Sequence, residues 1–431
     1  MSESLNPNQN APLLQKLAAR LGTPFWLYDD AEMRRRIADV KALTSAPGLQ
    51  ARYAMKASPS KRILKEMKKN GLWIDAVSAN ECFRAEQAGF ATGSHPPEIL
   101  YTADVFRGDW QKAILKDGVL PNIGSPGMVG DLAKEGYKGP LALRINVGFG
   151  HGHVNACDTG GPSSKHGIWW EDVSGTIAAA KSAGMPIVML HAHVGSGPKQ
   201  QELRDNLKRL IGVFAGLSGS FPDLQAISVG GGLPWNYRQP ETLDVPALAA
   251  ILADGQKELS KTAGREIRLE IEPGRYYVAS SCTLVTQVTD LKKTRSNEKG
   301  TGVEFIMVDA GFTDLVRPAM YGSYHRITIP ARVDRPTEPF CVAGPLCESG
   351  DVFTRGADEM LEPRALPRAE RGDLMCLHDA GAYGYAMSSH YNSLGRAPQV
   401  WVEEDGSIFL MSRRETLADL TAVETDEALH V

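Results

Sequence analysis

The sequence predicts an α/β fold joined to an all-β part, a (β/α)8 TIM-type barrel followed by a C-terminal β-sandwich or β-barrel domain. Eight short apolar runs between residues 50 and 275 alternate with segments of helical periodicity, and strands that alternate with helices form parallel sheets. Polar side chains gather at the carboxyl ends of these runs, as in barrel enzymes. Beyond about residue 280 helical segments become rare, so an all-β domain is expected there.

The strand-like runs are evenly spread along the predicted barrel. They are RYAMKA (52–57), LWIDAVS (72–78), EILYTAD (98–104), LPNIGS (120–125), LALRINVG (141–148), PIVMLHAHVG (186–195), LQAISVGGG (224–232) and IRLEIEPG (267–274). Between the first two, KRILKEMKKNG places Ile63, Leu64 and Met67 at helical spacing and ends in Asn-Gly at 70–71. This segment is therefore expected to be a helix with a C-terminal cap.

The remaining segments predict the second domain. Alternating runs such as VEFIMVDAGF and QVWVEEDGSIFLMSRR follow residue 280, and an Asp-Gly pair at 405–406 inside the latter indicates a hairpin. The amino-terminal segment 1–45 holds a helix around 12–21 and a strand at PFWLYD, and is expected to pack with the β-domain. The predicted boundaries are 46–284 for the barrel and 285–431 for the β-domain.

Composition narrows the class of protein. The 431 residues carry a formal net charge of −4, which gives no reason to expect nucleic acid or an anionic membrane as a partner. No apolar run approaches the roughly 20 residues that span a bilayer, and the polar start lacks the features of a signal peptide. Six cysteines without CxxC spacing are expected to be reduced thiols. A cytoplasmic location is expected.

Several of the polar residues at the strand ends suggest a cofactor. A lysine at a barrel rim forms a Schiff base with an aldehyde, and Lys56 stands at such an end. Glu272 either pairs with Arg275 or holds a proton on a pyridine nitrogen, which makes that ring an electron sink. SVGGG (228–232) and HVGSG (193–197) are tight turns or phosphate cradles. Together these features describe a pyridoxal 5'-phosphate site.

Ordered motifs along residues 15 to 420 resemble the diaminopimelate decarboxylase family. The resemblance implies a fold-type III pyridoxal-phosphate barrel enzyme of lysine biosynthesis, in the enterobacterial-type branch with its GFGHGH…TGGPSSKHG insertion. The motifs are YAMKA, DAVSANE, SKHGIW, HAHVGSG, SVGGGL, EIEPGR, VDAGFTDLVRPAMYGSYH, AGPLCESGDVF and DAGAYGYAMSSHYNS. Departures from the family pattern, KASPS and HYNSLGRAP, leave every catalytic group in place.

The resemblance implies a role for each matched residue. Lys56 would bind the aldehyde of the cofactor, His193 would stack on its ring, and Glu272 would pair with the ring nitrogen. In the family the CESGD segment comes from the partner subunit, so Cys347 would donate a proton across a homodimer with shared sites. Phosphate contacts are implied for Ser196, Gly231, Gly232 and Tyr383, and ring or network contacts for Asp75, Glu81 and Arg144. The catalytic set is then Lys56, His193 and Cys347.

The predicted substrate is an amino acid whose distal end carries both a carboxylate and an ammonium group. Arg275, Arg317, Tyr321 and Tyr383 offer cationic and hydroxyl donors for a distal carboxylate. Glu348 can accept from a distal ammonium. This pairing suits meso-2,6-diaminopimelate, which would yield L-lysine and CO2. Arg317 also has a plainer interpretation as a surface ion pair.

Other interpretations stay open at this point. A related decarboxylase of ornithine, lysine, arginine or carboxynorspermidine type would use the same barrel and lysine. An amino-acid racemase would need a catalytic tyrosine opposite the lysine, and a non-catalytic pyridoxal-phosphate-binding homologue would need none of Lys56, Cys347 and Glu348. The histidine pairs HGH (151–153, with Cys157) and HAH (191–193) lack the further ligands of a zinc site, so no metal is expected.

Overall fold

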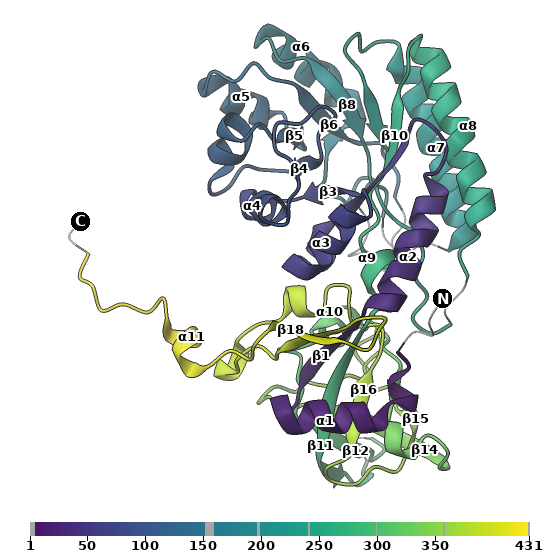
Figure 1. Cartoon of the computed structure of the whole chain (residues 1–431), viewed down its shortest axis with the longest axis vertical. Coiled ribbons are helices and arrows are strands. Elements are labelled where there is room, and N and C mark those ends of the chain that lie inside the picture. The colour runs from purple at the N-terminus through teal and green to yellow at the C-terminus, as the bar shows by residue number, and fades with distance from the viewer. Residues whose placement is uncertain are drawn as a thin grey trace. The chain divides into compact units, whose positions relative to one another are not determined.

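The computed structural model describes residues 5–150, 159–195, 199–239, 242–298, 300–356 and 358–429. The chain forms two compact units (Figure 1). The barrel unit comprises residues 35–236 and 240–277, and the sheet unit comprises residues 1–34, 237–239 and 278–431.

Eight parallel strands close the barrel unit. Their order is β5-β4-β3-β2-β10-β9-β8-β6, and β6 pairs back with β5. The strands are β2 (Leu49–Ala54), β3 (Trp73–Ala76), β4 (Ile99–Ala103), β5 (Leu120–Ile123), β6 (Leu141–Asn146), β8 (Ile187–His191), β9 (Ala226–Ser228) and β10 (Arg268–Ile271), with β7 (Ile168–Trp169) added to β6. Each predicted run holds one barrel strand, so the (β/α)8 prediction is confirmed.

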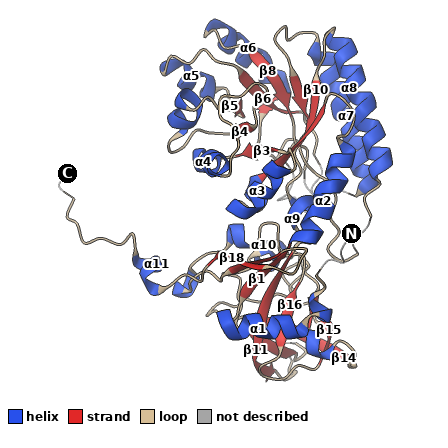
Figure 2. Cartoon of the chain, viewed as in Figure 1, coloured by secondary structure: helices blue, strands red, loops and turns tan. Residues whose placement is uncertain are grey.

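Helices follow most of the barrel strands (Figure 2). They are α3 (Lys61–Lys69), α4 (Ala79–Gln87), α5 (Gly127–Lys134), α6 (Val173–Ser182), α7 (Gln200–Ser218), α8 (Val245–Ala263) and α9 (Arg275–Val278), with α2 (Asp30–Leu43) preceding the barrel. In α3 the side chains of Ile63, Leu64 and Met67 are buried, as the periodicity predicts. Asn70 caps the helix and Gly71 takes a φ of +75°, which is favourable for glycine.

The barrel strands share an apolar core. One buried cluster takes a side chain from each of five consecutive strands of the closed sheet, β4, β5, β6, β8 and β9. Its members are Leu100, Leu120, Ala142, Met189 and Ala226. Such layers of side chains fill a barrel and hold its strands in register, so the residues that follow each strand are placed by a rigid frame.

The sheet unit is built around a nine-stranded sheet. Its main path runs β15-β14-β12-β11-β1-β17-β18, while β16 pairs with β11 and β13. The strands are β1 (Phe25–Asp29), β11 (Cys282–Lys293), β12 (Glu304–Val308), β13 (Ile327–Thr328), β14 (Thr337–Ala343), β15 (Arg364–Pro367), β16 (Leu374–Leu377), β17 (Gln399–Val402) and β18 (Ile408–Ser412). A mostly-sheet second domain was predicted and is confirmed.

Local features of the sheet unit follow the sequence pattern. The predicted Asp-Gly hairpin joins β17 and β18, with the Asp405 side chain accepting a 2.8 Å bond from the backbone of Ser407. Helix α1 (Ala11–Leu21) buries Leu14 and Leu17 in one cluster with β1. The other helices are α10 (Arg317–Tyr321) and α11 (Leu417–Thr421). In the described part of the chain no helix is both long and apolar enough to span a bilayer.

Candidate active site

Five predicted residues lie at the carboxyl ends of barrel strands. Lys56 is in the 3-10 turn Met55–Ala57 that follows β2. Asp75 is the next-to-last residue of β3, and Arg144 lies two residues before the end of β6. His193 comes two residues after β8, and Glu272 directly follows β10. Because parallel strands of a barrel end at one rim, the fold brings these side chains to one face of the barrel unit.

The turn after β2 presents Lys56 to solvent. Met55 and Ala57 on either side are buried, whereas Lys56 is exposed. The backbone N–H of Ser58 closes the turn with a 3.1 Å bond to the Met55 carbonyl. Lys56 is therefore accessible in the single chain. Its amine is open to a reactant at the rim.

Glu272 is a buried carboxylate with both oxygens engaged. His191 Nε2 lies 2.8 Å from Glu272 Oε2, and the Ser228 hydroxyl donates a 2.7 Å bond to Oε1. Burial alone would raise the pKa of Glu272, but the charge and hydrogen bond of His191, with Ser228, outweigh burial and lower this pKa to about 2. Glu272 is therefore an anion at neutral pH.

Two other carboxyl groups of the rim, those of Asp75 and Glu81, have raised pKa values. Burial, reinforced by the charge of Glu272, raises the pKa of Asp75 to about 6, although Thr102 donates a 2.5 Å bond to it. Burial also raises the pKa of Glu81, in the first turn of α4, to about 7. Environments that push carboxyl pKa values apart separate a permanent anion from groups that exchange protons near neutral pH.

The raised pKa of Glu81 predicts a pH-dependent stability. The folded chain holds this proton up to about pH 7, whereas the ordinary carboxyl titrates at 4.5, so stability falls as pH rises between these values. Between pH 5 and 8 the wild-type chain should lose about 1–2 kcal/mol more than Glu81→Gln, allowing for solvent screening. Urea unfolding at each pH measures this difference. Glu86→Gln, an exposed position on the same helix, should follow the wild type; parallel curves for all three would contradict the assignment.

His193 and the glycine turn are joined directly. The backbone N–H of Gly231 donates a 3.2 Å bond to His193 Nδ1, which leaves the ring proton on Nε2. Burial lowers the pKa of His193 well below 6.5, so the ring is neutral. Gly232 has a φ of +102°, and a Cβ on Gly231 would lie 2.6 Å from the Glu272 carbonyl oxygen. Only glycine fits this turn. Ser196, the predicted phosphate donor, lies outside the described residues.

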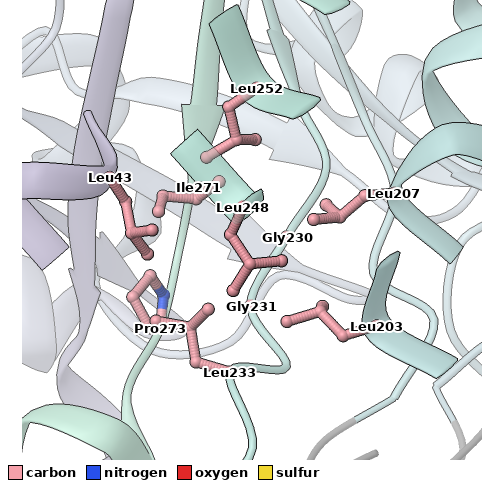
Figure 3. A pocket seen from close by; sticks show the side chains of 10 residues that line it. All are labelled: Leu43, Leu203, Leu207, Gly230, Gly231, Leu233, Leu248, Leu252, Ile271 and Pro273. Carbon is pink, nitrogen blue, oxygen red and sulfur yellow. The ribbon is translucent and has the colours of Figure 1, made fainter. Parts of the chain in front are cut away.

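A small apolar cavity backs the glycine turn (Figure 3). It encloses about 10 Å³, at the lower limit for one water molecule. The side chains around it come from α2, α7, α8, β10 and the segment after the glycines: Leu43, Leu203, Leu207, Leu233, Leu248, Leu252, Ile271 and Pro273. The turn therefore rests on tightly packed apolar side chains, which fix its backbone.

Two predicted arginines of the barrel unit are buried, Arg144 and Arg275. Burial lowers the pKa of Arg144, and the charges of Asp104, Asp75 and Glu272 offset part of this effect. Arg275 begins α9 and is also buried. Beside Arg144, His166 Nδ1 lies 2.6 Å from Asp104 Oδ2.

The sheet unit carries the other predicted residues. Arg317 and Tyr321 are the first and last residues of α10, which places them on one face of the helix. Arg317 is buried, with Nη1 3.2 Å from His325 Nε2 and its guanidinium 4.9 Å from the centroid of the Tyr237 ring. An isolated surface ion pair does not describe this environment.

Cys347 and Glu348 lie in an exposed loop that other loops hold in place. The Asn392 side chain accepts a 3.1 Å bond from the Cys347 backbone. The Asp351 carboxylate accepts bonds from the backbone of Phe312 at 2.7 Å and of Leu346 at 2.8 Å. It thereby ties the CESGD loop to the segment that leads into α10. Tyr383 has a φ of +60°, a conformation that costs a non-glycine residue energy and is frequent at functional sites.

Sequence reasoning missed several partners of these residues. His191, Ser228, Asp351 and His325 were not among the predicted site residues. A signal was available for His191, because it stands two positions before His193 at the end of the same strand. Among the described residues no group of three or more metal-ligating side chains occurs; His151, His153 and Cys157 lie outside them.

The geometry defines a class of enzyme. A barrel rim with an accessible lysine, a permanent buried anion and a glycine turn suits a phosphorylated aldehyde with a basic ring nitrogen, which is the chemistry of pyridoxal phosphate. The family described as "Pyridoxal-dependent decarboxylase, pyridoxal binding domain" matches residues 31–279.

Known proteins narrow this class. Diaminopimelate decarboxylase of Escherichia coli K12 is 39% identical over 428 residues, covering 98% of both chains, and that of Streptomyces coelicolor is 39% identical over 97% of this chain and 92% of its own. A crystal structure of diaminopimelate decarboxylase matches 96% of this chain and 97% of its own with a TM-score of 0.88 at 39% identity. The Helicobacter pylori enzyme, solved with L-lysine, matches 95% and 98% with a TM-score of 0.81 at 27% identity. The chain belongs to the diaminopimelate decarboxylase family.

The residues present fit the cofactor that this family name implies. Glu272 is ionised and so suits a protonated ring nitrogen, Lys56 offers a free amine, and the glycine turn brings backbone close to His193 without a side chain between. These observations concern the chain's own donors and acceptors. Glu272 suits the ring nitrogen of pyridoxal phosphate, Lys56 suits its aldehyde, and the glycine turn leaves room for its phosphate.

Proposed function

We propose that the protein decarboxylates meso-2,6-diaminopimelate to L-lysine and CO2 with pyridoxal 5'-phosphate bound covalently to Lys56. The observation that carries the proposal is the pair formed by His191 and Glu272 at the rim that also bears Lys56. Bound pyridoxal phosphate supplies an electron sink for the two electrons that the departing CO2 leaves behind. That sink requires a protonated ring nitrogen, and an ionised Glu272 stabilises such a proton.

Other barrel residues are proposed to contact the ring and the phosphate of the cofactor. Neutral His193 offers a flat face for stacking without adding charge to the site. Gly231 and Gly232, with Ser196 and Tyr383, are proposed to bind the phosphate. Asp75, Glu81 and Arg144 are proposed to support the ring; the raised pKa values of the two acids let them take up or release a proton near neutral pH.

The sheet unit is proposed to supply substrate recognition. Arg317, with Tyr321 and Tyr383, is suited to bind the distal carboxylate of the substrate, and Arg275 of the barrel unit is proposed to act with them. Glu348 would accept from the distal ammonium. The Cys347 thiol would give its proton to the α-carbon after CO2 leaves. Arg317 Nη1 lies 3.2 Å from His325 Nε2, a contact that supports a fixed guanidinium at this position.

A homodimer with shared sites is also proposed. Strand β18 forms an edge of the sheet and exposes apolar side chains, among them Ile408 at 44% and Leu410 at 55%. Exposed apolar side chains on an edge strand are often covered by a partner, and a second copy of the chain would cover these. We propose a cytoplasmic location as well, since the five cysteines in the described residues are free thiols.

The test is CO2 release by the protein loaded with pyridoxal phosphate. We expect strong preference for meso-diaminopimelate, with lysine as product, over L-lysine, D-lysine, L-ornithine and L-arginine in parallel assays. The preference should exceed about 100-fold, because a simple diamino acid leaves the buried Arg317 without a carboxylate. Equal or better activity on ornithine, arginine or lysine would contradict the substrate and keep the barrel chemistry. Racemisation without CO2 would contradict the reaction.

A further inference from the structure

Among the described residues, the side chain of His191 forms one hydrogen bond, with Glu272. It is the last residue of β8 and is 1% exposed, and in the sheet it pairs with Arg144 on β6 and Ser228 on β9. Its Nε2 donates to Glu272 Oε2 at 2.8 Å. Its Nδ1 is buried and has no hydrogen-bond partner within the described ranges. Buried polar atoms are nearly always paired, and exceptions need an explanation.

Ser228 is the second hydrogen-bond donor to the Glu272 carboxylate. The backbone N–H of Gly230 donates a 3.2 Å bond to Ser228 Oγ, which turns the hydroxyl proton toward Glu272 Oε1 at 2.7 Å. Each carboxylate oxygen thus accepts from its own buried donor. Rotation of the carboxylate would break both bonds, and in a buried site each lost bond leaves an unsatisfied polar group.

We propose that His191 is a positioning residue that keeps Glu272 ionised and fixed, and so sets the chain's preference for a cofactor with a protonated ring nitrogen. The inference rests on the proposed function. Its physical basis is the balance at Glu272, where burial favours the neutral acid and the donors favour the anion. Without His191, Glu272 would keep the hydrogen bond from Ser228 and the more distant charge of Arg52. A neutral carboxylic acid cannot stabilise a proton on a pyridine nitrogen.

A purely structural histidine makes a different prediction from a positioning one. If His191 only fills space, its removal loosens the rim and weakens every ligand of the same shape alike. If it acts through Glu272, the loss is confined to ligands that carry a basic nitrogen at the ring position. The two roles are therefore separated by a pair of ligands that differ in that one atom.

The experiment compares pyridoxal 5'-phosphate with its 1-deaza analogue, in which a C–H group replaces the ring nitrogen. Dissociation constants are measured by absorbance for the wild type, His191→Leu and His191→Gln, with circular dichroism to check folding. For His191→Leu we expect pyridoxal phosphate to bind about 10- to 100-fold more weakly, and the analogue to change by less than about threefold. His191→Gln, whose amide can still donate, should keep most of the preference.

Two further variants serve as controls for the role of His191. Ser228→Ala should reduce the preference in the same direction, while Thr176→Val, a buried hydroxyl of α6, should not. Equal weakening of both ligands, or no change in either, overturns the inference. If His191→Leu does not fold, His191→Phe, which also lacks a hydrogen-bond donor, replaces it, and an unchanged preference in that variant overturns the inference. A wild type that binds neither ligand through Lys56 contradicts the proposed function instead.

Discussion

Lys56→Ala is expected to lose covalent cofactor attachment and at least about 1,000-fold in turnover, since none of the other predicted rim residues, Asp75, Arg144, His193 and Glu272, carries a primary amine. The side chain is exposed, while its neighbours Met55 and Ala57 are buried and hold the turn. Removal of the lysine side chain opens no cavity, so folding should be unaffected. Borohydride reduction followed by peptide mass analysis measures the attachment, and CO2 release measures the turnover.

The matched control is Lys61→Ala. Lys61 is another exposed lysine, the first residue of α3 five positions further along the chain. Its replacement should leave a pyridoxyl group on the peptide that contains Lys56 and should leave turnover unchanged. The assignment fails if Lys56→Ala keeps wild-type turnover, or if the reduced wild-type protein carries the pyridoxyl group on a different lysine.

The barrel was predictable because its signals are local. Each strand is a short apolar run, and each polar residue of the rim stands at the end of its own run, as Lys56 does after β2 and Glu272 after β10. Parallel topology then places those ends together. The same locality explains the helix at Lys61–Lys69, whose apolar positions and Asn-Gly stop lie within eleven residues of sequence.

The partners of the site residues were not predictable in the same way. Glu272 and His191 are 81 positions apart, and sequence reasoning offered the nearby Arg275 as the ionic partner instead. The contrast between Glu272 and Asp75 depends on burial and on neighbours contributed by other strands. Nor did spacing show that Asp351 ties two loops of the sheet unit together. Such facts depend on tertiary contacts, which the local pattern does not contain.

Cys347→Ala is expected to lower kcat by about 100-fold or more with little change in cofactor affinity, because general acid catalysis typically contributes about 10²–10⁴-fold. The thiol lies in an exposed loop whose backbone is held by Asn392, so the change should not disturb the fold. Cys341→Ala, a buried cysteine of β14, is the comparison and should affect stability more than turnover. Steady-state rates and cofactor dissociation constants measured on the same preparations separate the two effects.

Mixing the two variants tests whether sites are shared between subunits. If Lys56 and Cys347 of different chains serve one site, a heterodimer of Lys56→Ala with Cys347→Ala contains one intact site. Random pairing of equal amounts should then restore about a quarter of wild-type activity. Differently tagged subunits allow the heterodimer to be purified and assayed alone. A heterodimer as inactive as its parents would mean that both residues act within one chain, and would contradict the shared-site homodimer while leaving the role of Lys56 intact.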